Sequence, residues 1–249
     1  MTTPRSTTER LKIWPYTWTS LAWFAAAFVA LTALFTLTGW AVVSWLEPTS
    51  LGQAEADFNV WLEDNRTSGL NTLATVASVP SDTPVKIGLM VLLLVAFPLV
   101  WKRWHDWAFL LGALALEVSV YGLSSWIVGR PRPDVERLSS APTESYPSGH
   151  VAAAVTFYIG LALIVGWHTE RRELRAAAWI AGIVIPIAMI ASRLYLGMHY
   201  ISDVIGGVVL GALSLIIALR IARMGLDETT EESSQALPDD LEEFDLTET

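Results

Sequence analysis

The chain has 249 residues, of which 53% are apolar and only 16% charged, and this balance excludes an ordinary water-soluble domain. The formal net charge of −9 does not indicate a surface for basic partners, because the acidic residues are concentrated in the tail from Asp227 to Glu248. The absence of cysteine excludes disulfides, thiolate metal sites and a cysteine nucleophile. Together these features predict a membrane protein.

Six apolar runs approach or exceed the roughly 20 helical residues needed to cross the hydrocarbon core of a bilayer. They cover residues 21–46, 85–101, 107–128, 151–167, 176–196 and 201–221. The runs are too long for strands and lack the alternation of a transmembrane barrel, so they predict helices. The first run is too long for a signal-peptide core and lacks a convincing cleavage site, so we expect it to be retained. The predicted fold is an all-α, polytopic integral membrane bundle of six transmembrane helices.

These spans divide the chain into three parts. We expect a cytoplasmic amino-terminal segment over residues 1–17, a six-span domain over residues 18–223 and an acidic, disordered cytoplasmic tail over residues 224–249. Between the first two spans, Phe58 and Trp61 stand among acidic residues, which predicts a short amphipathic helix in the membrane interface.

The positions of lysine and arginine predict the orientation, because short loops rich in these residues stay cytoplasmic. If the amino terminus is inside, ten of the sixteen fall in inside segments. These ten are Arg5, Arg10, Lys12, Lys102, Arg103, Arg171, Arg172, Arg175, Arg220 and Arg223. Both termini are then cytoplasmic, and the loops that carry three polar clusters lie on the external face of a multi-pass protein of the cell membrane.

The three polar clusters interrupt the apolar sequence beside the ends of spans. They are Gly129-Arg130-Pro131-Arg132-Pro133, Pro147-Ser148-Gly149-His150, and Ser192-Arg193 with His199 and Asp203. Charged groups next to hydrophobic runs are costly in a bilayer, so they indicate a functional site.

The second cluster stands at the start of the fourth predicted span. A helix amino terminus offers unpaired N–H groups to an anion, and Gly149 permits close approach of the backbone, so a phosphate would fit there. The alternative is an ordinary helix cap by Ser148, followed by a glycine and an interfacial His150.

In the third cluster, His199 and Asp203 are four residues apart and share a face if a helix begins near Met198. The carboxylate would then orient the imidazole, leaving one ring nitrogen as a nucleophile. Arg193 can present a planar fork to phosphate oxygens. Alternatively, Asp203 caps or pairs locally and Arg193 reaches towards lipid headgroups.

Arg130 and Arg132 are each followed by proline, which predicts a stiff, extended segment that aims both guanidinium groups at a fixed place. The alternative for this pair is a stop signal combined with headgroup binding.

In this order, the three clusters resemble the type 2 phosphatidic acid phosphatase superfamily of membrane lipid phosphatases. Its signature consists of Lys-x6-Arg-Pro, Pro-Ser-Gly-His and Ser-Arg-x5-His-x3-Asp. The second part is matched at residues 147–150, and the first is matched only at Arg132-Pro133. The third part is matched by Ser192, Arg193, His199 and Asp203. The resemblance spans the helical core from the second span to the sixth.

The resemblance implies that His199 takes the phosphoryl group, that Asp203 orients it and that His150 protonates the leaving oxygen. The groups implied to hold the phosphate oxygens are Arg132, Arg193, the Ser148 side chain and the Gly149 N–H. Arginines can neutralise the oxygen charge without a metal, and these loops contain no carboxylate cluster suitable for magnesium. We therefore expect neither a metal nor another cofactor.

Ser125 stands where the family pattern has lysine, seven positions before Arg132. Losing that lysine removes a charge-assisted contact of about 1.5–3 kcal/mol if nothing replaces it. Arg130 and Arg137 are the candidates for a replacement.

The predicted function is hydrolysis of a lipid phosphate or diphosphate. Polyprenyl diphosphate ranks first, because an external site suits recycling of a carrier released outside the cell; phosphatidic acid and phosphatidylglycerol phosphate are alternatives. A transporter or flippase is disfavoured because the polar residues cluster at one face instead of near mid-span. Ser125 suggests a third class, a catalytically weak headgroup-binding protein. The expected partners are the lipid substrate and the bilayer, with no nucleic acid and no prediction of oligomeric state.

Overall fold

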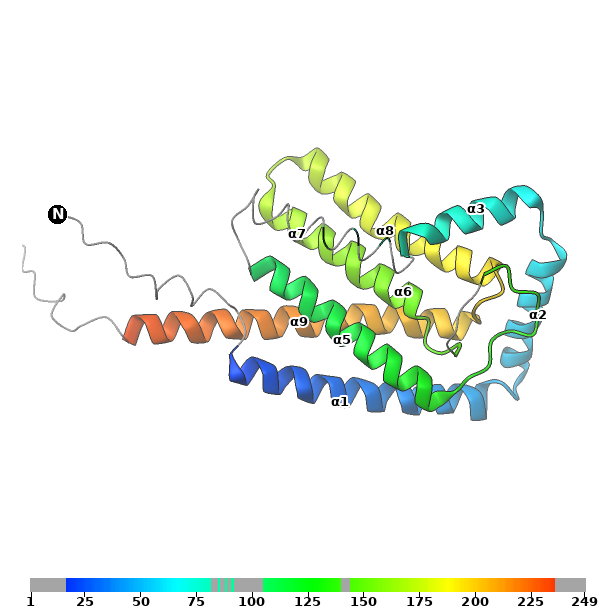
Figure 1. Cartoon of the computed structure of the whole chain (residues 1–249), viewed down its shortest axis with the longest axis horizontal. Coiled ribbons are helices and arrows are strands. Elements are labelled where there is room, and N and C mark those ends of the chain that lie inside the picture. The colour runs from blue at the N-terminus through cyan, green and yellow to red at the C-terminus, as the bar shows by residue number, and fades with distance from the viewer. Residues whose placement is uncertain are drawn as a thin grey trace, which may run out of the picture.

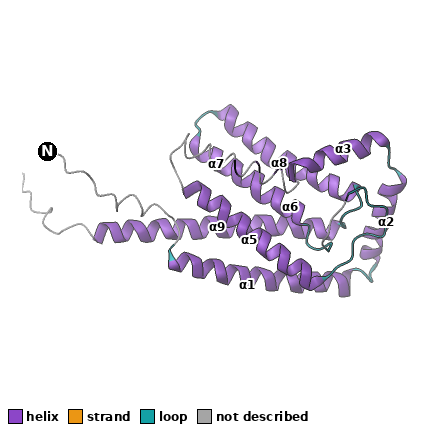
Figure 2. Ribbon diagram, viewed as in Figure 1, coloured by secondary structure: helices purple, strands orange, loops and turns teal. Residues whose placement is uncertain are grey.

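A computed structural model describes residues 17–81, 85, 88, 91, 105–139 and 144–235. Within these ranges every regular element is a helix and no strand occurs, as Figure 2 shows. The predicted all-α class is therefore confirmed for the part of the chain that the structure describes.

Five helical segments of the described chain are long and apolar enough to cross a membrane. Their elements are α1 (Trp18–Ala41) with a π-helical end (Val42–Leu46), α5 (His105–Val128), α6 (Gly149–Ala154) joined by a π-helical turn (Val155–Ile159) to α7 (Gly160–His168), α8 (Arg172–Tyr195) and α9 (Ile201–Gln235). The expected span 85–101 lies outside the described residues except at positions 85, 88 and 91. The number six therefore stays a prediction.

The connection after the first span contains two helices, where the sequence predicts one. These are α2 (Ser50–Asp64) and α3 (Ser68–Ser78), which ends in a 3-10 turn (Val79–Ser81). Each begins at a threonine cap: the Thr49 hydroxyl accepts the Gly52 N–H at 3.3 Å, and the Thr67 hydroxyl accepts the Leu70 N–H at 3.2 Å. The placement of α2 or α3 in the membrane interface stays a prediction.

The last helix extends beyond the boundary expected at residue 224. α9 continues to Gln235, so the first part of the acidic segment is helical where the sequence predicts disorder. No proline occurs between residue 201 and Pro238, so the backbone hydrogen-bond ladder has no obligatory break there. Residues 236–249, like residues 1–16, lie outside the described chain.

The polar clusters meet at one end of the bundle. In Figure 1, α1, α5 and α8 finish at the end where α6 and α9 begin, and α2 and α3 lie across this end. The first cluster follows α5, the second opens α6 and the third connects α8 to α9. The structure thus confirms that the clusters lie together, whereas the membrane face they occupy stays a prediction.

Small residues bring α6 and α9 into close contact, as expected for the spacing of Gly207 and Gly211. A Cβ atom added at Gly207 would lie 2.5 Å from the Ser148 carbonyl oxygen. One added at Gly211 would lie 2.6 Å from the Ala152 carbonyl oxygen. Both distances are below van der Waals contact with backbone, so the two helices can approach this closely only because these positions lack side chains.

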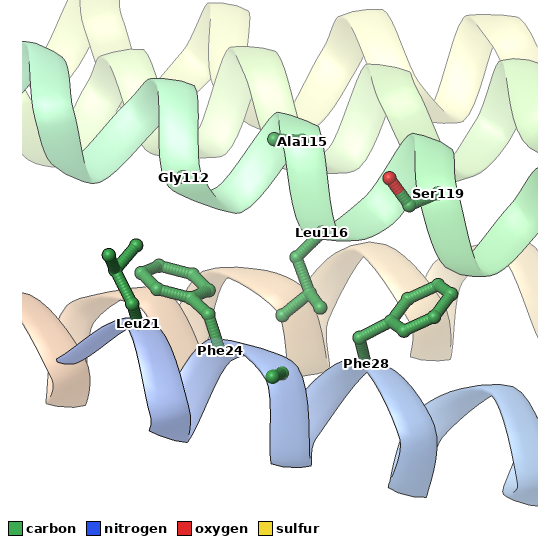
Figure 3. Close-up of a pocket in the computed structure, with 8 residues that line it drawn as sticks. Leu21, Phe24, Phe28, Gly112, Ala115, Leu116 and Ser119 are labelled. Carbon is green, nitrogen blue, oxygen red and sulfur yellow. The ribbon is translucent and has the colours of Figure 1, made fainter. Parts of the chain in front are cut away.

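The contact between α1 and α5 leaves space between the side chains. An apolar cavity of about 390 Å³ lies between them, lined on the α1 side by Leu21, Phe24 and Phe28 and on the α5 side by Leu116 and Ser119, among others (Figure 3). None of its lining residues belongs to the three polar clusters. We therefore place the candidate site at the loop end and not in this cavity.

Replacing Gly211 with leucine should lower the thermal stability of the protein. The new side chain would have to displace the α6 backbone, and overpacking of this kind costs about 1–3 kcal/mol. The unfolding temperature in detergent measures the effect. Gly122→Ala on α5 is the matched control, because a Cβ there meets nothing within 4 Å. An unchanged unfolding temperature for Gly211→Leu would contradict the close α6–α9 contact.

Candidate active site

A left-handed glycine directs the chain from α5 into the first cluster. Gly129 has φ +62°, a left-handed backbone conformation that residues with a Cβ atom rarely adopt. Its N–H donates to the Ser125 carbonyl at 3.0 Å. The following residues, Arg130 to Pro133, have no regular secondary structure, as their two prolines predict. This turn carries the two arginines towards the residues between α8 and α9.

His199 lies just before α9 and is 2% exposed. Its Nδ1 lies 2.8 Å from the Ser145 carbonyl oxygen, and because a carbonyl only accepts, Nδ1 is the protonated nitrogen. Nε2 therefore carries the lone pair, and it lies 3.4 Å from Nη1 of Arg132. The geometry gives His199 one nitrogen fixed as a donor and one nitrogen with a lone pair that faces a cation.

Asp203 lies in the first turn of α9 and is fully buried. Its Oδ2 accepts the Tyr200 N–H at 2.8 Å and a short hydrogen bond from the Ser145 hydroxyl. The same oxygen is 3.7 Å from Nδ1 of His199, beyond direct hydrogen bonding. Asp203 and His199 lie close together, but α9 begins at Ile201, so His199 precedes the helix instead of sharing a helical face with Asp203. The group that accepts the histidine proton is the Ser145 carbonyl.

Arg130 is 1% exposed and is surrounded by carboxylates. Its Nε donates to Glu47 at 2.7 Å, and its Nη1 donates to Asp203 at 2.5 Å. The guanidinium carbon lies 4.3 Å from the centre of the Tyr200 ring. Burial by itself lowers the pKa of Arg130, but Asp203 and Glu47 together raise it above its usual value. The expected contact of Arg130 with phosphate is untested, and this geometry favours a structural pairing instead.

Arg132 and Arg193 come from two different segments, the turn after α5 and the last turn of α8. Arg132 donates to the Met198 carbonyl at 2.5 Å and to the Glu144 carbonyl at 3.1 Å. Arg193, in the last turn of α8, is 2% exposed, and its carbonyl accepts the Met198 N–H at 3.0 Å. Both arginines are thus connected through Met198 to the backbone next to His199.

The second cluster forms the start of α6. Ser148 is the cap residue; its N–H donates to the Asp203 carbonyl at 2.9 Å, and its buried hydroxyl has no hydrogen-bond partner among the described residues. A Cβ added at Gly149 would lie 2.6 Å from the Tyr121 ring, so glycine is needed for this approach. His150 is the second residue of α6 and is partly exposed.

Ser125 lies in the last turn of α5, where the family pattern has lysine. It is 2% exposed, and its hydroxyl has no hydrogen-bond partner among the described residues. Tyr121, one turn earlier on the same face, packs against Gly149, which directs this face of α5 towards the start of α6. Ser192 of the third cluster donates to the Ala74 carbonyl at 2.6 Å and so fastens α3 to α8.

Four residues that contact Arg130 or His199 belong to none of the three sequence motifs: Glu47, Glu55, Ser145 and Tyr200. The two glutamates belong to the connection after the first span, where the only sequence indication is an acidic segment in a chain whose polar clusters are basic. Ser145 acts through its carbonyl, which every residue type provides.

Among the described residues, no group of three or more histidines and carboxylates is arranged to hold a metal ion, and the expected independence of metal stays a prediction.

The fold and site together define a multi-pass helical membrane protein with a buried histidine, aspartate and arginine cluster at one end. Residues 106–226 match the model of the PAP2 superfamily. The matched part includes all three polar clusters, so the resemblance inferred from the motifs is confirmed.

Three curated relatives match over part of their length. The chain is 37% identical over 93 residues to phosphatidylglycerophosphatase B of Bacillus subtilis, covering 36% of this chain and 45% of the relative. It is 34% identical over 110 residues to a lipid A 1-phosphatase of Rhizobium johnstonii, covering 40% and 41%. It is 32% identical over 117 residues to a candidate undecaprenyl-diphosphatase of Escherichia coli, covering 43% and 52%. The matches thus span about half of each relative or less.

A solved structure shares the fold over most of both chains. It is a transmembrane PAP2-type phosphatidylglycerolphosphate phosphatase from Bacillus subtilis, with a TM-score of 0.66 and 24% sequence identity. The likeness covers 81% of this chain and 96% of that structure.

His199 should remain neutral at pH values where an ordinary histidine is protonated. Burial lowers the pKa of the imidazole below 6.5, and Asp203 opposes this effect without cancelling it. Titration of the ¹⁵N-labelled protein by NMR, with the signal assigned by His199→Gln, measures the midpoint. Asp203→Asn should lower the midpoint further, because it removes the charge that favours imidazolium. A midpoint above 6.5 in the unmodified protein would contradict the buried environment.

Proposed function

We propose that the protein hydrolyses a lipid phosphate monoester or diphosphate with His199 as the nucleophile. The observation that carries this proposal is the orientation of His199: Nδ1 is held by the Ser145 carbonyl at 2.8 Å, and Nε2 faces Arg132 at 3.4 Å. An anion drawn to Arg132 would meet the lone pair of Nε2. Burial also favours the neutral, nucleophilic form of the imidazole.

The reaction has two steps. Nε2 of His199 attacks phosphorus, the bond from phosphorus to the leaving oxygen breaks, and His150 donates a proton to that oxygen. Water then attacks the phosphohistidine, a proton passes to His150, and inorganic phosphate leaves. Each residue role is implied by the family pattern, and microscopic reversibility assigns both proton transfers to the same group.

The phosphate oxygens would be held by Arg132, Arg193, the Ser148 hydroxyl and the Gly149 N–H. Phosphoryl transfer depends mainly on positioning and on neutralising oxygen charge, and buried donors are effective because they need little reorganisation. The Ser148 hydroxyl supports this assignment, since a buried polar atom without a protein partner is costly unless a ligand or water satisfies it.

An apolar groove next to the site supports a substrate with a hydrocarbon tail. It has a volume of about 310 Å³, lies between α1 and α9, and is lined by Leu34, Phe35, Ile205 and Val209 together with the site neighbours Tyr146 and Ser202. Ser202 directly precedes Asp203, so a chain in this groove would end beside the reacting groups. A polyprenyl diphosphate, phosphatidic acid or phosphatidylglycerol phosphate would each satisfy this description.

Among these substrates we favour polyprenyl diphosphate. This choice follows from the proposed topology, with both termini cytoplasmic and the site outside, where the spent carrier is released. The candidate undecaprenyl-diphosphatase among the relatives supports this choice, whereas two other relatives have names that specify different lipids.

Release of inorganic phosphate by the detergent-purified protein tests the function, with a panel of polyprenyl diphosphate, phosphatidic acid and phosphatidylglycerol phosphate. His199→Gln should reduce the rate below about one thousandth of the parent, because the nucleophile is lost. His168→Gln, at the opposite end of the bundle, is the matched control and should retain the parent rate. A parent protein that binds these lipids without releasing phosphate would instead be a transporter or a headgroup-binding protein.

Single cysteines test the proposed topology, because the chain has none of its own. In intact cells, a membrane-impermeant thiol reagent should label Gly69→Cys in α3, where an added Cβ meets nothing within 4 Å. The same reagent should label Ser234→Cys only after the cells are opened. Labelling of Ser234→Cys but not Gly69→Cys in intact cells would place the site on the cytoplasmic face.

A further inference from the structure

All three guanidinium nitrogens of Arg130 form hydrogen bonds or ion pairs with other residues of the protein. Its Nε contacts Glu47 at 2.7 Å, its Nη1 contacts Ser202 at 2.8 Å and Asp203 at 2.5 Å, and its Nη2 lies 3.6 Å from Glu55. Glu55 in turn accepts the Ser202 N–H at 2.7 Å and the Ser202 hydroxyl at 2.8 Å. The cluster therefore joins the end of α1, α2, the turn after α5 and the start of α9.

This arrangement is unsuited to a phosphate ligand. Turning the guanidinium towards a phosphate would break its contacts with the buried carboxylate of Asp203 and with Glu47. Separating the partners of a buried ion pair costs more than a single phosphate contact returns. The Tyr200 ring also covers one face of the guanidinium.

Arg130 is connected to the nucleophile by two paths that meet at Ser145. The Arg130 carbonyl accepts the Ser145 N–H at 2.8 Å, and the Arg130 side chain holds Asp203, whose Oδ2 accepts the Ser145 hydroxyl. The Ser145 carbonyl then accepts the Nδ1 proton of His199 at 2.8 Å. The orientation of the imidazole therefore depends on a residue that Arg130 holds through both its main chain and its side chain.

We propose that Arg130 is a positioning residue: it holds Asp203 and Ser145, and through them the His199 imidazole, while Glu47 and Glu55 hold Arg130. This inference rests on the proposed function and assigns no contact between Arg130 and the substrate. It gives the acidic connection between α1 and α3 a role in aligning the nucleophile. A small rotation of the imidazole would misdirect Nε2, and misplacement by about 1 Å can cost roughly a hundredfold in rate.

The test is steady-state phosphate release by the full chain in detergent, together with the inhibition constant of inorganic phosphate. Arg130→Lys keeps the charge but loses the planar set of donors, so we expect kcat to fall about ten- to a hundredfold. KM and the inhibition constant should stay within about twofold of the parent, because phosphate binding is untouched. Arg132→Lys is the contrasting variant and should weaken inhibition by phosphate.

The exposed Arg175→Lys, in α8, is the matched control and should behave as the parent. A parental kcat for Arg130→Lys overturns the proposal, and so does a parallel rise in the inhibition constant, which would mean that Arg130 contacts phosphate. If Arg130→Lys does not fold, Glu47→Gln decides, because Glu47 is partly exposed and its loss is milder. A lower kcat with unchanged phosphate inhibition then supports the proposal, and a parental kcat overturns it.

A double variant separates positioning from a general loss of stability. Ser145→Ala removes the hydroxyl that bonds Asp203 but keeps the carbonyl that holds His199. If Arg130 acts through this path, combining Ser145→Ala with Arg130→Lys should lower kcat by less than the product of the two single effects. Multiplying effects would overturn the proposed path. If the parent itself releases no phosphate from any lipid in the panel, the proposed function has failed, a result distinct from these.

Discussion

Arg130 and Asp203 meet at 2.5 Å with almost no exposure to solvent, and the arrangement of the loop end follows from this pair. A buried ion pair persists only where further groups satisfy the remaining hydrogen-bonding capacity of both partners. For Arg130 these are Glu47, Ser202 and the face of Tyr200; for Asp203 they are the Ser145 hydroxyl and the Tyr200 N–H. Four segments that are separate in sequence must therefore meet around one pair of charges.

The second condition is the close contact between α6 and α9. Because Gly207 has no side chain, the start of α6 can approach α9 closely enough for the Ser148 N–H to reach the Asp203 carbonyl at 2.9 Å. That hydrogen bond sets the distance between the proposed phosphate-binding turn and the buried aspartate. Packing of small residues within the membrane region thus determines the geometry at its edge.

The arrangement also bears on the missing lysine of the family pattern. Arg130 is the basic residue of the first cluster nearest in sequence to Ser125, but its charge is already matched by the buried carboxylate of Asp203 and by Glu47. The proposed function therefore relies on Arg132 and Arg193 as the cations for phosphate. A serine hydroxyl donates a neutral hydrogen bond, which is weaker than the charge-assisted contact of a lysine.

The amino-acid sequence by itself determined the helical class, five of the apolar spans as helices in the described chain, and the identity of the motif residues. Hydropathy and motif spacing are local in sequence, and they suffice where burial in a bilayer allows only helices. They also placed His199 near Asp203, although the helix begins at Ile201, so the two residues do not share a helical face as the four-residue spacing predicted. The third predicted span, residues 107–128, lies within α5 (His105–Val128).

Only the tertiary structure decided what these residues contact. It assigned the histidine proton to the Ser145 carbonyl, a backbone group that no side-chain pattern reveals. It paired Arg130 with Glu47 and Asp203, although the sequence favours a role for Arg130 beside phosphate. The partner of a buried charge is set by which distant segments pack together, and that depends on the whole bundle rather than on the residues next to the charge in the chain.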